Sequence, residues 1–200
     1  MTHKEKLSTV ESIFSSSIEL KSIILKNGLE IIVEMCDLCV ASFLNKNKLL
    51  ICSNGGSAAD SQHLAAELLV RLRPHINRLG VPAISLNLDS SSITACANDY
   101  SYEVYYERMV QTLGAPGDVL LGITTSGNSE NIIKALKVAK EKELICLGFL
   151  GNNGGKALEY CDKSFIVPSS DTGRIQEVHI TAGHALMQLI EDGLISNKFI

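Results

Sequence analysis

After Asn47 the sequence alternates short apolar runs with longer amphipathic stretches, and this alternation limits the possible folds more than any other feature. The apolar runs are "KLLICS", "AISLNL", "DVLLGIT", "LICLGFL" and "KSFIVP", and segments with helical spacing of apolar residues separate them. Strands joined through helices pair in parallel and are covered on both faces. We therefore predict an α/β fold with a doubly wound, five-stranded parallel sheet. The last helix is expected from about Thr172 to Ser196.

The segment before Asn47 has a different pattern. Apolar residues at helical spacing predict two helices between about residues 4 and 45, joined near Asn27 and Gly28. The chain has 200 residues, of which 46% are hydrophobic, and it contains no low-complexity tract. This size suits one buried core. We predict a single domain over residues 1–200, with an N-terminal helical extension (1–45) used in oligomerisation and an α/β core (48–196).

Charge and hydropathy exclude several classes of partner. The net charge is −4 and the basic residues are scattered, so the chain has no nucleic-acid-binding footprint. No apolar run reaches the ~18 residues of a membrane helix, and the N-terminus has no signal-peptide core. We expect a cytoplasmic protein without a membrane partner. Cys36 and Cys39 form a C-x-x-C, but it lies in an apolar helical pattern without a second such pair, which favours buried packing over zinc or redox chemistry.

Two of the predicted strand-to-helix loops are suited to an anion. Ligands of open parallel sheets bind beyond the carboxyl ends of the strands. In "SNGGS", Gly55 and Gly56 permit positive φ and close approach of backbone N–H groups, while Ser57 suits an N-cap. In "TTSGNSEN", hydroxyls precede a helix N-terminus, where an anion is favoured; they belong to Thr124, Thr125, Ser126 and Ser129. Neither loop matches a dinucleotide or P-loop motif. Each alone is compatible with a simple capped turn, but together they predict a sugar-phosphate site.

Titratable residues occur in two of the predicted helices. His63 and Glu67 are four residues apart and share a helix face, as a surface pair or as a reactive pair. His184 lies in an otherwise apolar helix. Gln176, eight residues before it, is about 80° around the helix, whereas Glu177, seven before it, is nearly in line. The angles favour Glu177 as the partner of His184, but periodicity does not decide between the two.

Several motifs together resemble a known family. The stretches "NGGSAADSQHLAAEL", "NDY", "TTSGNSENIIKAL", "GGKALEYCD" and "GRIQEVHITAGHALMQLIE" resemble phosphoheptose isomerases of the sugar isomerase (SIS) family. The likeness extends from about residue 48 to 192, in the family's order and spacing. It implies the SIS fold and isomerisation of sedoheptulose 7-phosphate to D-glycero-D-manno-heptose 7-phosphate. This reaction begins the synthesis of bacterial surface heptose, for lipopolysaccharide or capsule.

The resemblance also implies roles for particular residues. Glu67 and His184 become the catalytic acid–base pair, and one zinc ion per subunit, with partial occupancy expected, is held by His63, Glu67, Gln176 and His184. It thus selects Gln176 where the helix angles favour Glu177. Members of the family are homotetramers with sites at subunit interfaces. The implied substrate contacts are Asn54, Gly55, Gly56, Ser57, Glu67, Asn98, Asp99, Thr124, Thr125, Ser126, Ser129 and Gln176.

The residue types suit this chemistry, and two other functions are compatible with the motifs. A ketose becomes an aldose when a base removes the proton next to the carbonyl and an acid or a metal stabilises the enediolate oxygen. The alternatives are a non-catalytic relative that binds the bacterial replication initiator and a sugar-phosphate sensor. The presence of both Glu67 and His184 favours the enzyme. The sequence has no basic helix-turn-helix segment of the kind that a DNA-bound sensor would need. Four residues depart from the family pattern: Ser53, Val70, Leu72 and Gly173.

Overall fold

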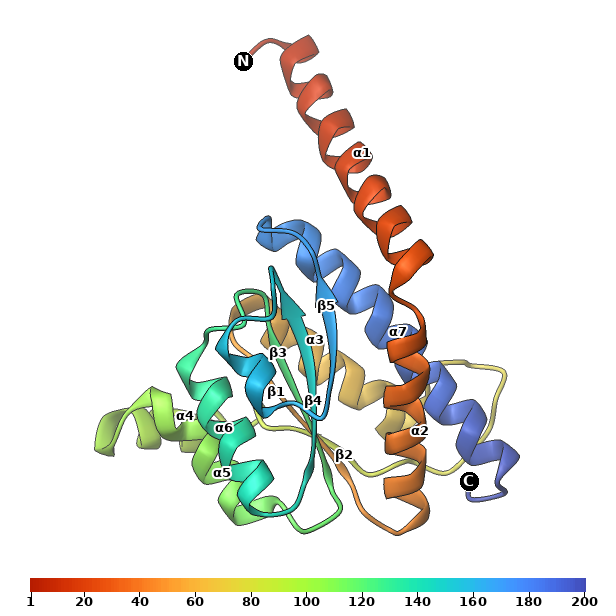
Figure 1. Cartoon of the computed structure of the whole chain (residues 1–200), viewed down its shortest axis with the longest axis vertical. Coiled ribbons are helices and arrows are strands. Elements are labelled where there is room, and N and C mark those ends of the chain that lie inside the picture. Colours follow the sequence, from red (N-terminus) through yellow and green to blue (C-terminus); the bar gives the residue numbers. More distant parts are fainter.

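A five-stranded parallel sheet forms the centre of the molecule, with helices on both of its faces (Figure 1). The computed structural model describes residues 1–200. The order of the strands is β2-β1-β3-β4-β5, and all four neighbouring pairs are parallel. The predicted doubly wound α/β fold is therefore confirmed. The strands are β1 (Leu49–Cys52), β2 (Ala83–Ser85), β3 (Val119–Thr124), β4 (Ile145–Gly151) and β5 (Lys163–Val167).

Seven α-helices surround the sheet. One apolar cluster joins α2, α3 and α7 to one face, and a second joins α4, α5 and α6 to the other. Three short helical segments complete the chain: η1 (Glu67–Arg71, a π-helix), η2 (Tyr102–Val104) and η3 (Lys156–Tyr160), both 3₁₀. The α-helices are α1 (His3–Asn27), α2 (Glu30–Leu44), α3 (Gly55–Ala66), α4 (Ser90–Asp99), α5 (Tyr105–Leu113), α6 (Glu130–Glu141) and α7 (Thr172–Ser196).

The central strands are covered on both faces, which explains their continuous apolar sequences. Every residue of β3 is buried. Gly122 in this strand lies directly under α6, since a Cβ there would meet Ile132 Cγ2 at 3.0 Å. Its missing side chain allows the helix to approach the sheet closely. After β1 the chain moves outward to β2 and then returns to the other side of β1 to form β3. The loops after β1 and β3 therefore lie at the topological switch point, where doubly wound sheets bind ligands.

Two local predictions need correction. The helix expected from Ser57 begins at Gly55, with Asn54 in the N-cap position, so Ser57 is a buried residue of the first turn and not the cap. Gly55 has φ +57°, and this conformation starts the helix early because glycine adopts it without steric cost. The helical segment predicted between the fourth and fifth apolar runs forms only the 3₁₀ segment η3. Five residues are too few for a stable α-helix there.

The prediction of buried packing for the C-x-x-C pair is confirmed. All six cysteines are free, and Cys36 and Cys39 are buried in α2 among apolar residues. Burial raises the pKa of Cys36 to about 11, so the thiolate that metal binding and redox exchange require is disfavoured. None of the helices is long and apolar enough to cross a membrane.

The N-terminal helical extension consists of α1 and α2, with the predicted break near Gly28. The Thr2 hydroxyl accepts from Glu5 N and the Glu5 carboxylate accepts from Thr2 N, which is a capping box at the start of α1. Figure 1 shows that α1 projects beyond the body of the molecule. Only Leu20 and Ile24 of this helix are buried, whereas Leu7, Phe14 and Ile18 are exposed.

A buried histidine makes folding stability depend on pH. The ring of His179 is 1% exposed, its Nε2 lies 3.2 Å from the carbonyl oxygen of Leu150, and its Nδ1 has no partner. Burial lowers its pKa to about 4, below the ordinary 6.5. The unfolded chain therefore binds this proton more readily than the folded one. The stability that neutral His179 contributes is complete above pH 6.5 and is lost as the pH falls towards 4.

We expect the free energy of unfolding to fall by up to about 3 kcal/mol between pH 6.5 and 4 on account of this one group. The measurement is urea unfolding at a series of pH values, compared with His179→Gln, whose amide can still donate to Leu150. The free energy of unfolding of the variant should change less steeply between pH 6.5 and 4, by a slope that corresponds to the uptake of about one proton. Parallel curves for the two proteins would show that His179 does not titrate as described.

Candidate active site

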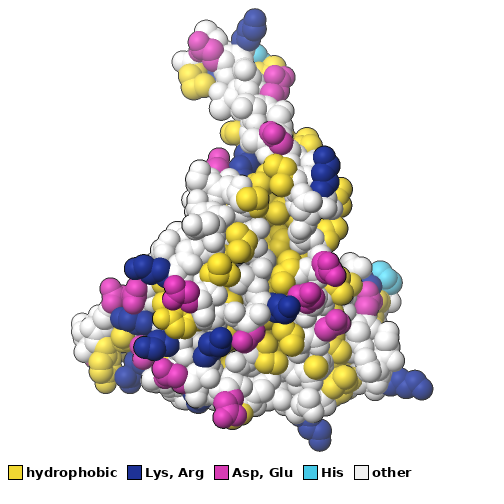
Figure 2. All heavy atoms as spheres, in the orientation of Figure 1, with side chains coloured by type: hydrophobic (Ala, Val, Ile, Leu, Met, Phe, Trp, Pro, Cys, Tyr) yellow, Lys and Arg dark blue, Asp and Glu magenta, His cyan; other side chains and the backbone are white.

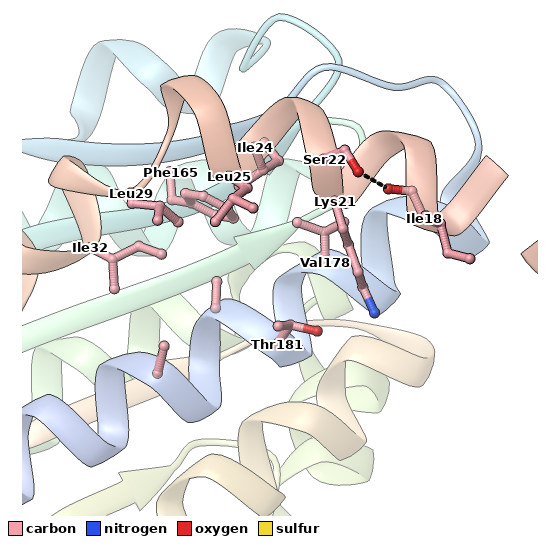
Figure 3. A pocket seen from close by; sticks show the side chains of 12 residues that line it. Ile18, Lys21, Ser22, Ile24, Leu25, Leu29, Ile32, Phe165, Val178 and Thr181 are labelled. Atoms are coloured by element: carbon pink, nitrogen blue, oxygen red, sulfur yellow. Dashed lines mark hydrogen bonds between the residues drawn. The ribbon is translucent and has the colours of Figure 1, made fainter. Parts of the chain in front are cut away.

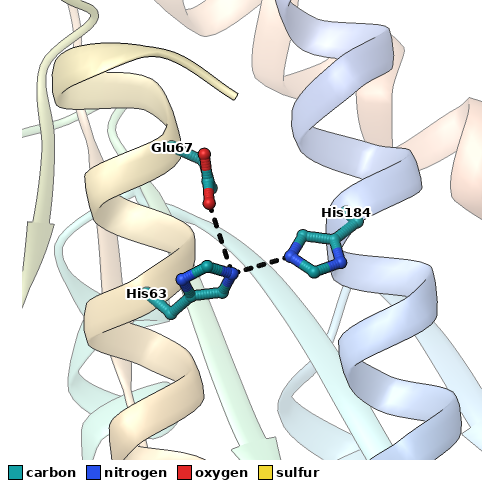
Figure 4. Close-up of side chains that lie close together, drawn as sticks. All are labelled: His63, Glu67 and His184. Carbon is teal, nitrogen blue, oxygen red and sulfur yellow. Dashed lines mark hydrogen bonds and ion pairs between the residues drawn. The ribbon is translucent and has the colours of Figure 1, made fainter. Parts of the chain in front are cut away.

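Three titratable side chains from two helices meet at one point of the molecule (Figure 4). His63 Nε2 lies 2.7 Å from His184 Nε2 and 3.2 Å from Glu67 Oε1. The ligand atoms of the three residues all lie within 4.8 Å of one another. His184 and His63 are 121 residues apart in the sequence. The structure therefore brings the His63–Glu67 pair together with His184, as the resemblance implied.

Local structure explains how the two helices place these groups. His63 is on α3, and Glu67 is the first residue of the π-helical segment η1 that follows it. π-helical turns occur frequently at functional sites. Helix α7 approaches closely because Gly183 precedes His184: a Cβ at Gly183 would lie 2.8 Å from the Leu64 side chain. The glycine therefore allows the imidazole of His184 to reach His63.

The cluster can serve proton transfer or metal binding. Two imidazole nitrogens facing each other at 2.7 Å cannot both carry a proton, so at least one presents a lone pair. Two imidazole nitrogens and a carboxylate oxygen are a donor set that zinc accepts. A further carboxylate, Asp60, lies one turn before His63; burial raises its pKa, and His63 and His184 lower it in part. Sequence reasoning did not select Asp60.

Gln176, the fourth predicted metal ligand, lies elsewhere within this chain. Its Nε2 is 3.4 Å from where a Cβ of Gly56 would be, at the beginning of α3. Eight residues of helix separate it from His184, a rise of about 12 Å. One chain thus brings together three of the four predicted ligands. Glu177, which the helix angles favoured, is bound by Arg174, and that interpretation was wrong.

The loop after β1 is the first half of a candidate anion site. The first helical bond of α3 runs from Ala58 N to Asn54 O. The N–H groups of Gly55, Gly56 and Ser57 therefore have no helical partner, as at any helix N-terminus. Gly55 and Gly56 are exposed. Free N–H groups and the helix dipole favour an anion at this point.

The loop after β3 provides the second half. The Thr124 hydroxyl lies 3.0 Å from that of Ser129 and 3.3 Å from that of Ser126. Ser129 is the N-cap residue of α6, but its hydroxyl makes no capping bond to the helix. Gly127 has φ +66°, and a Cβ there would lie 2.1 Å from the carbonyl oxygen of Gly154. The glycine makes the tight turn of this loop possible. Thr125 is half-buried and its carbonyl accepts from Asn152 Nδ2.

Asn54 is held by a hydrogen-bond network that sequence reasoning missed. Its amide exchanges hydrogen bonds with the amide of Asn131 on α6, at 2.8 and 2.9 Å. The Tyr102 hydroxyl donates to Asn54 Oδ1 at 2.7 Å. The side chain of Asn54 thus joins the two loops, which leaves the backbone of the "NGG" turn for a ligand. The last Asn of "TTSGNSEN" was the only sequence signal for this link.

Two other predicted contacts lie near this network. Asn98 and Asp99 end α4, and Asn98 Nδ2 donates to Asp99 Oδ1 at 2.8 Å. Both are exposed, three or four residues before Tyr102. No hydrogen bond joins them to the other predicted site residues. Their role towards substrate stays a prediction.

The departures from the family pattern have different surroundings. The Ser53 hydroxyl donates to the carbonyl of Ile123 at 2.7 Å and so links the ends of β1 and β3. Val70 is 69% exposed, whereas Leu72 packs against the apolar core. Gly173 N donates to Asp171 Oδ1 at the start of α7. None of the four removes a group of the cluster.

Comparison with known proteins agrees with this geometry. A family model described as "SIS domain" matches residues 14–151. The phosphoheptose isomerase of Clostridium acetobutylicum is 47% identical over 94% of this chain and 96% of its own length, and that of Aquifex aeolicus is 46% identical over 93% and 96%. The solved phosphoheptose isomerase from Neisseria gonorrhoeae superposes with a TM-score of 0.87 at 38% identity, covering 93% of this chain and 98% of that one.

A parallel sheet with two glycine- and hydroxyl-rich loops at its switch point, and a histidine–carboxylate cluster on the neighbouring helices, define the class as a doubly wound α/β protein whose candidate site lies at the carboxyl ends of the strands. Within this class, the chain belongs to the SIS domain family and, inside that family, to the phosphoheptose isomerases. The fold and family predicted from the motifs are confirmed. The solved Vibrio vulnificus NanR protein shares only 14% identity with this chain, which shows the common fold alone.

Proposed function

We propose that this protein isomerises sedoheptulose 7-phosphate to D-glycero-D-manno-heptose 7-phosphate, for the synthesis of bacterial surface heptose in lipopolysaccharide or capsule. The observation that carries this proposal is the cluster of Glu67, His63 and His184, which lies about two helical turns from the loops suited to a phosphate (the phosphate cradle). The substrate class comes from the phosphoheptose isomerases that this chain resembles over nearly its whole length. Sugar phosphates are substrates of the cytoplasm, in agreement with the six free cysteines.

The spacing of cradle and cluster fits a long sugar phosphate. Gly56 lies beside Gln176 at one end of the paired helices α3 and α7, and His63 lies beside His184 further along both. Seven or eight residues of helix separate the two places, a rise of about 10–12 Å. An extended seven-carbon chain with a terminal phosphate has a comparable length. The phosphate can therefore occupy the cradle while C1 and C2 reach the cluster.

In this arrangement the chain's own groups move the protons. The carboxylate of Glu67 removes a proton from C1 of the ketose and returns it to C2, so that one C–H bond breaks and another forms. The imidazole of His184 protonates the C2 oxygen as the enediol forms and receives the proton of the C1 hydroxyl as the aldose forms. Low exposure of the Glu67 side chain, at 15%, limits competition from water.

The decisive experiment follows aldose formation from a panel of C5, C6 and C7 ketose phosphates. Turnover of the C7 substrate with a kcat/KM well above that of the shorter sugars is expected. Binding of sugar phosphates without turnover of any would contradict the proposal and favour the sensor. Absence of both binding and turnover, with capture of the replication initiator, would favour the non-catalytic relative.

The hydroxyl loop should contribute to affinity. We expect Ser126→Ala and Ser129→Ala each to weaken substrate binding by roughly 0.5–1.5 kcal/mol, and by more if the lost bond is to a charged phosphate oxygen. Titration calorimetry with the sugar phosphate measures this effect. Thr112→Ala is the control, because that hydroxyl bonds only to its own helix. Unchanged affinity in both serine variants would show that the loop does not bind the substrate and serves only to cap α6.

A zinc ion is part of the proposal. His63, Glu67 and His184 would supply three ligands, and Gln176 is the expected fourth, which requires another subunit or a change in the position of its side chain. When bound, zinc would polarise the substrate carbonyl as a Lewis acid. His63→Ala should lower the zinc content found by elemental analysis and weaken zinc binding in calorimetry. His75→Ala, in an exposed loop position, is the matched control. Equal zinc content in both variants would exclude the cluster as the metal site.

We also propose that the chain forms a homotetramer with sites at subunit interfaces. Figure 2 shows apolar side chains gathered along α1 and below it. A groove of about 390 Å³ between the α1–α2 junction and α7 has nine hydrophobic residues among its twelve (Figure 3). Exposed apolar surface of this kind marks an association site. Light scattering should show a tetramer at micromolar concentration, and a stable monomer would contradict the shared-site arrangement.

A further inference from the structure

Arg78 lies beneath the segment that carries Glu67. Its side chain is 1% exposed although it belongs to the irregular stretch between η1 and β2. Nη2 donates to the carbonyl of Glu67 at 2.7 Å, and Nη1 donates to the carbonyls of Leu68 and Leu79 at 2.8 and 2.9 Å. Glu67 and Leu68 are the first two residues of η1, and the Leu68 carbonyl also accepts from Val81 N at 3.0 Å. The guanidinium therefore binds the backbone of the residue whose carboxylate belongs to the cluster.

The same guanidinium reaches the helix of His184. Arg78 Nε donates to Glu191 Oε1 at 2.6 Å, and the Glu191 side chain is also 1% exposed. Glu191 follows His184 by seven residues, or about two helical turns, and so lies on the same face of α7. Arg78 is thus a rigid connection between the backbone of Glu67 and the helix that carries His184.

Arg73 binds the same carboxylate as Arg78 and allows the two arginines to be compared. Its Nε donates to the other oxygen of Glu191 at 2.6 Å, and its Nη2 binds Asp192. Its side chain is 20% exposed, and it makes no hydrogen bond to the carbonyls of η1. Arg73 and Arg78 therefore share the carboxylate of Glu191, but only Arg78 touches the backbone under Glu67.

Stability alone does not account for the buried pair. Desolvating two charges costs about as much as their attraction returns, and apolar replacements of a buried ion pair are often equally stable. What a planar guanidinium adds is geometry, because its fixed fork holds several acceptors in one arrangement. Lysine carries the same charge but cannot bind the two η1 carbonyls and Glu191 together.

We propose that Arg78 is a positioning residue of the isomerase. It holds the start of η1 against α7 so that the carboxylate of Glu67 faces His63 and His184. This inference rests on the proposed function, since it assigns Arg78 to the same proton transfer. It predicts that replacement of the guanidinium lowers turnover and leaves substrate binding nearly unchanged, because Arg78 makes no hydrogen bond to the loops proposed to bind the phosphate.

The test compares Arg78→Lys with Arg73→Lys. We expect Arg78→Lys to lower kcat at least tenfold with KM within about threefold of wild type, and Arg73→Lys to keep kcat within twofold. Because Arg78 acts through Glu67, Arg78→Lys added to Glu67→Gln should cause little further loss. If Arg78→Lys does not fold, Glu191→Gln, which keeps the side-chain volume, is expected to show the same loss of kcat.

Crystal structures of the variants give a readout independent of turnover. The Glu67–His63 contact, 3.2 Å here, should be lost in Arg78→Lys and kept in Arg73→Lys. Equal kcat in the two variants, additive losses with Glu67→Gln, or an unchanged contact would each overturn the positioning role. If the wild type turns over no sugar phosphate, the proposed function fails, while the crystal structures still decide the role of Arg78.

Discussion

Glu67→Gln is expected to lower kcat for the ketose phosphate by about 10²–10⁴-fold, the usual contribution of a group that transfers a proton in the transition state. The amide has nearly the volume of the carboxylate, so η1 and its contact with His63 should keep their shape. It has no basic oxygen, however, and cannot remove a proton from carbon. Since the proposed phosphate site lies about two helical turns away, KM should change little.

Steady-state kinetics with the C7 ketose phosphate measure this effect, and circular dichroism confirms folding. Glu141→Gln, an exposed carboxylate at the end of α6, is the matched control and should behave as wild type. Exchange of substrate hydrogen with deuterium from solvent gives a second readout, because it requires removal of the proton but not product release. A Glu67→Gln enzyme with near-normal turnover and exchange would exclude Glu67 as the base.

His184→Ala is expected to reduce kcat by a similar factor of about 10²–10⁴. The imidazole is the partner of His63 at 2.7 Å, and its removal deprives the enediol oxygens of a proton donor. His179→Gln, five residues earlier on the same helix, is the matched control. His179 packs against the rings of Phe149 and Phe165 and not against the cluster, so its replacement should leave kcat nearly unchanged at neutral pH.

The double variant Glu67→Gln/His184→Ala distinguishes one proton-transfer sequence from two separate effects. Residues that act as a unit give strongly non-additive losses, so the double variant should lose far less than the product of the single losses. A loss of kcat in the double variant equal to the product of the two single losses would mean that the residues act independently. Near-normal turnover in both single variants would exclude the catalytic assignment and favour the non-catalytic relative.

Helix periodicity determined part of this site and could not determine the rest. The i,i+4 spacing of His63 and Glu67 placed them on one face, and this holds although η1 begins at Glu67. Periodicity says which residues of α7 share a face, but not which neighbour that face meets. Glu177 is nearly in line with His184, yet it pairs with Arg174 near the carbonyl of Ile13. The pair itself is local, since its members are three residues apart on α7, but the bond from Arg174 to the carbonyl of Ile13 depends on the position of α1, which no local pattern encodes.

The sequence by itself determined the sheet, most of its helices and the two loops rich in glycine and hydroxyl groups. Their signals are local: apolar runs of strand length, glycines where φ is positive, and hydroxyls before a helix. Only the tertiary structure decided which distant groups meet: His184 beside His63, Asn54 bound to Asn131, and Arg78 under Glu67. Such contacts arise from the packing of whole helices. Gly183, for example, leaves room for the side chain of Leu64, so that α3 and α7 lie close together. Packing of this kind couples residues that lie more than a hundred positions apart.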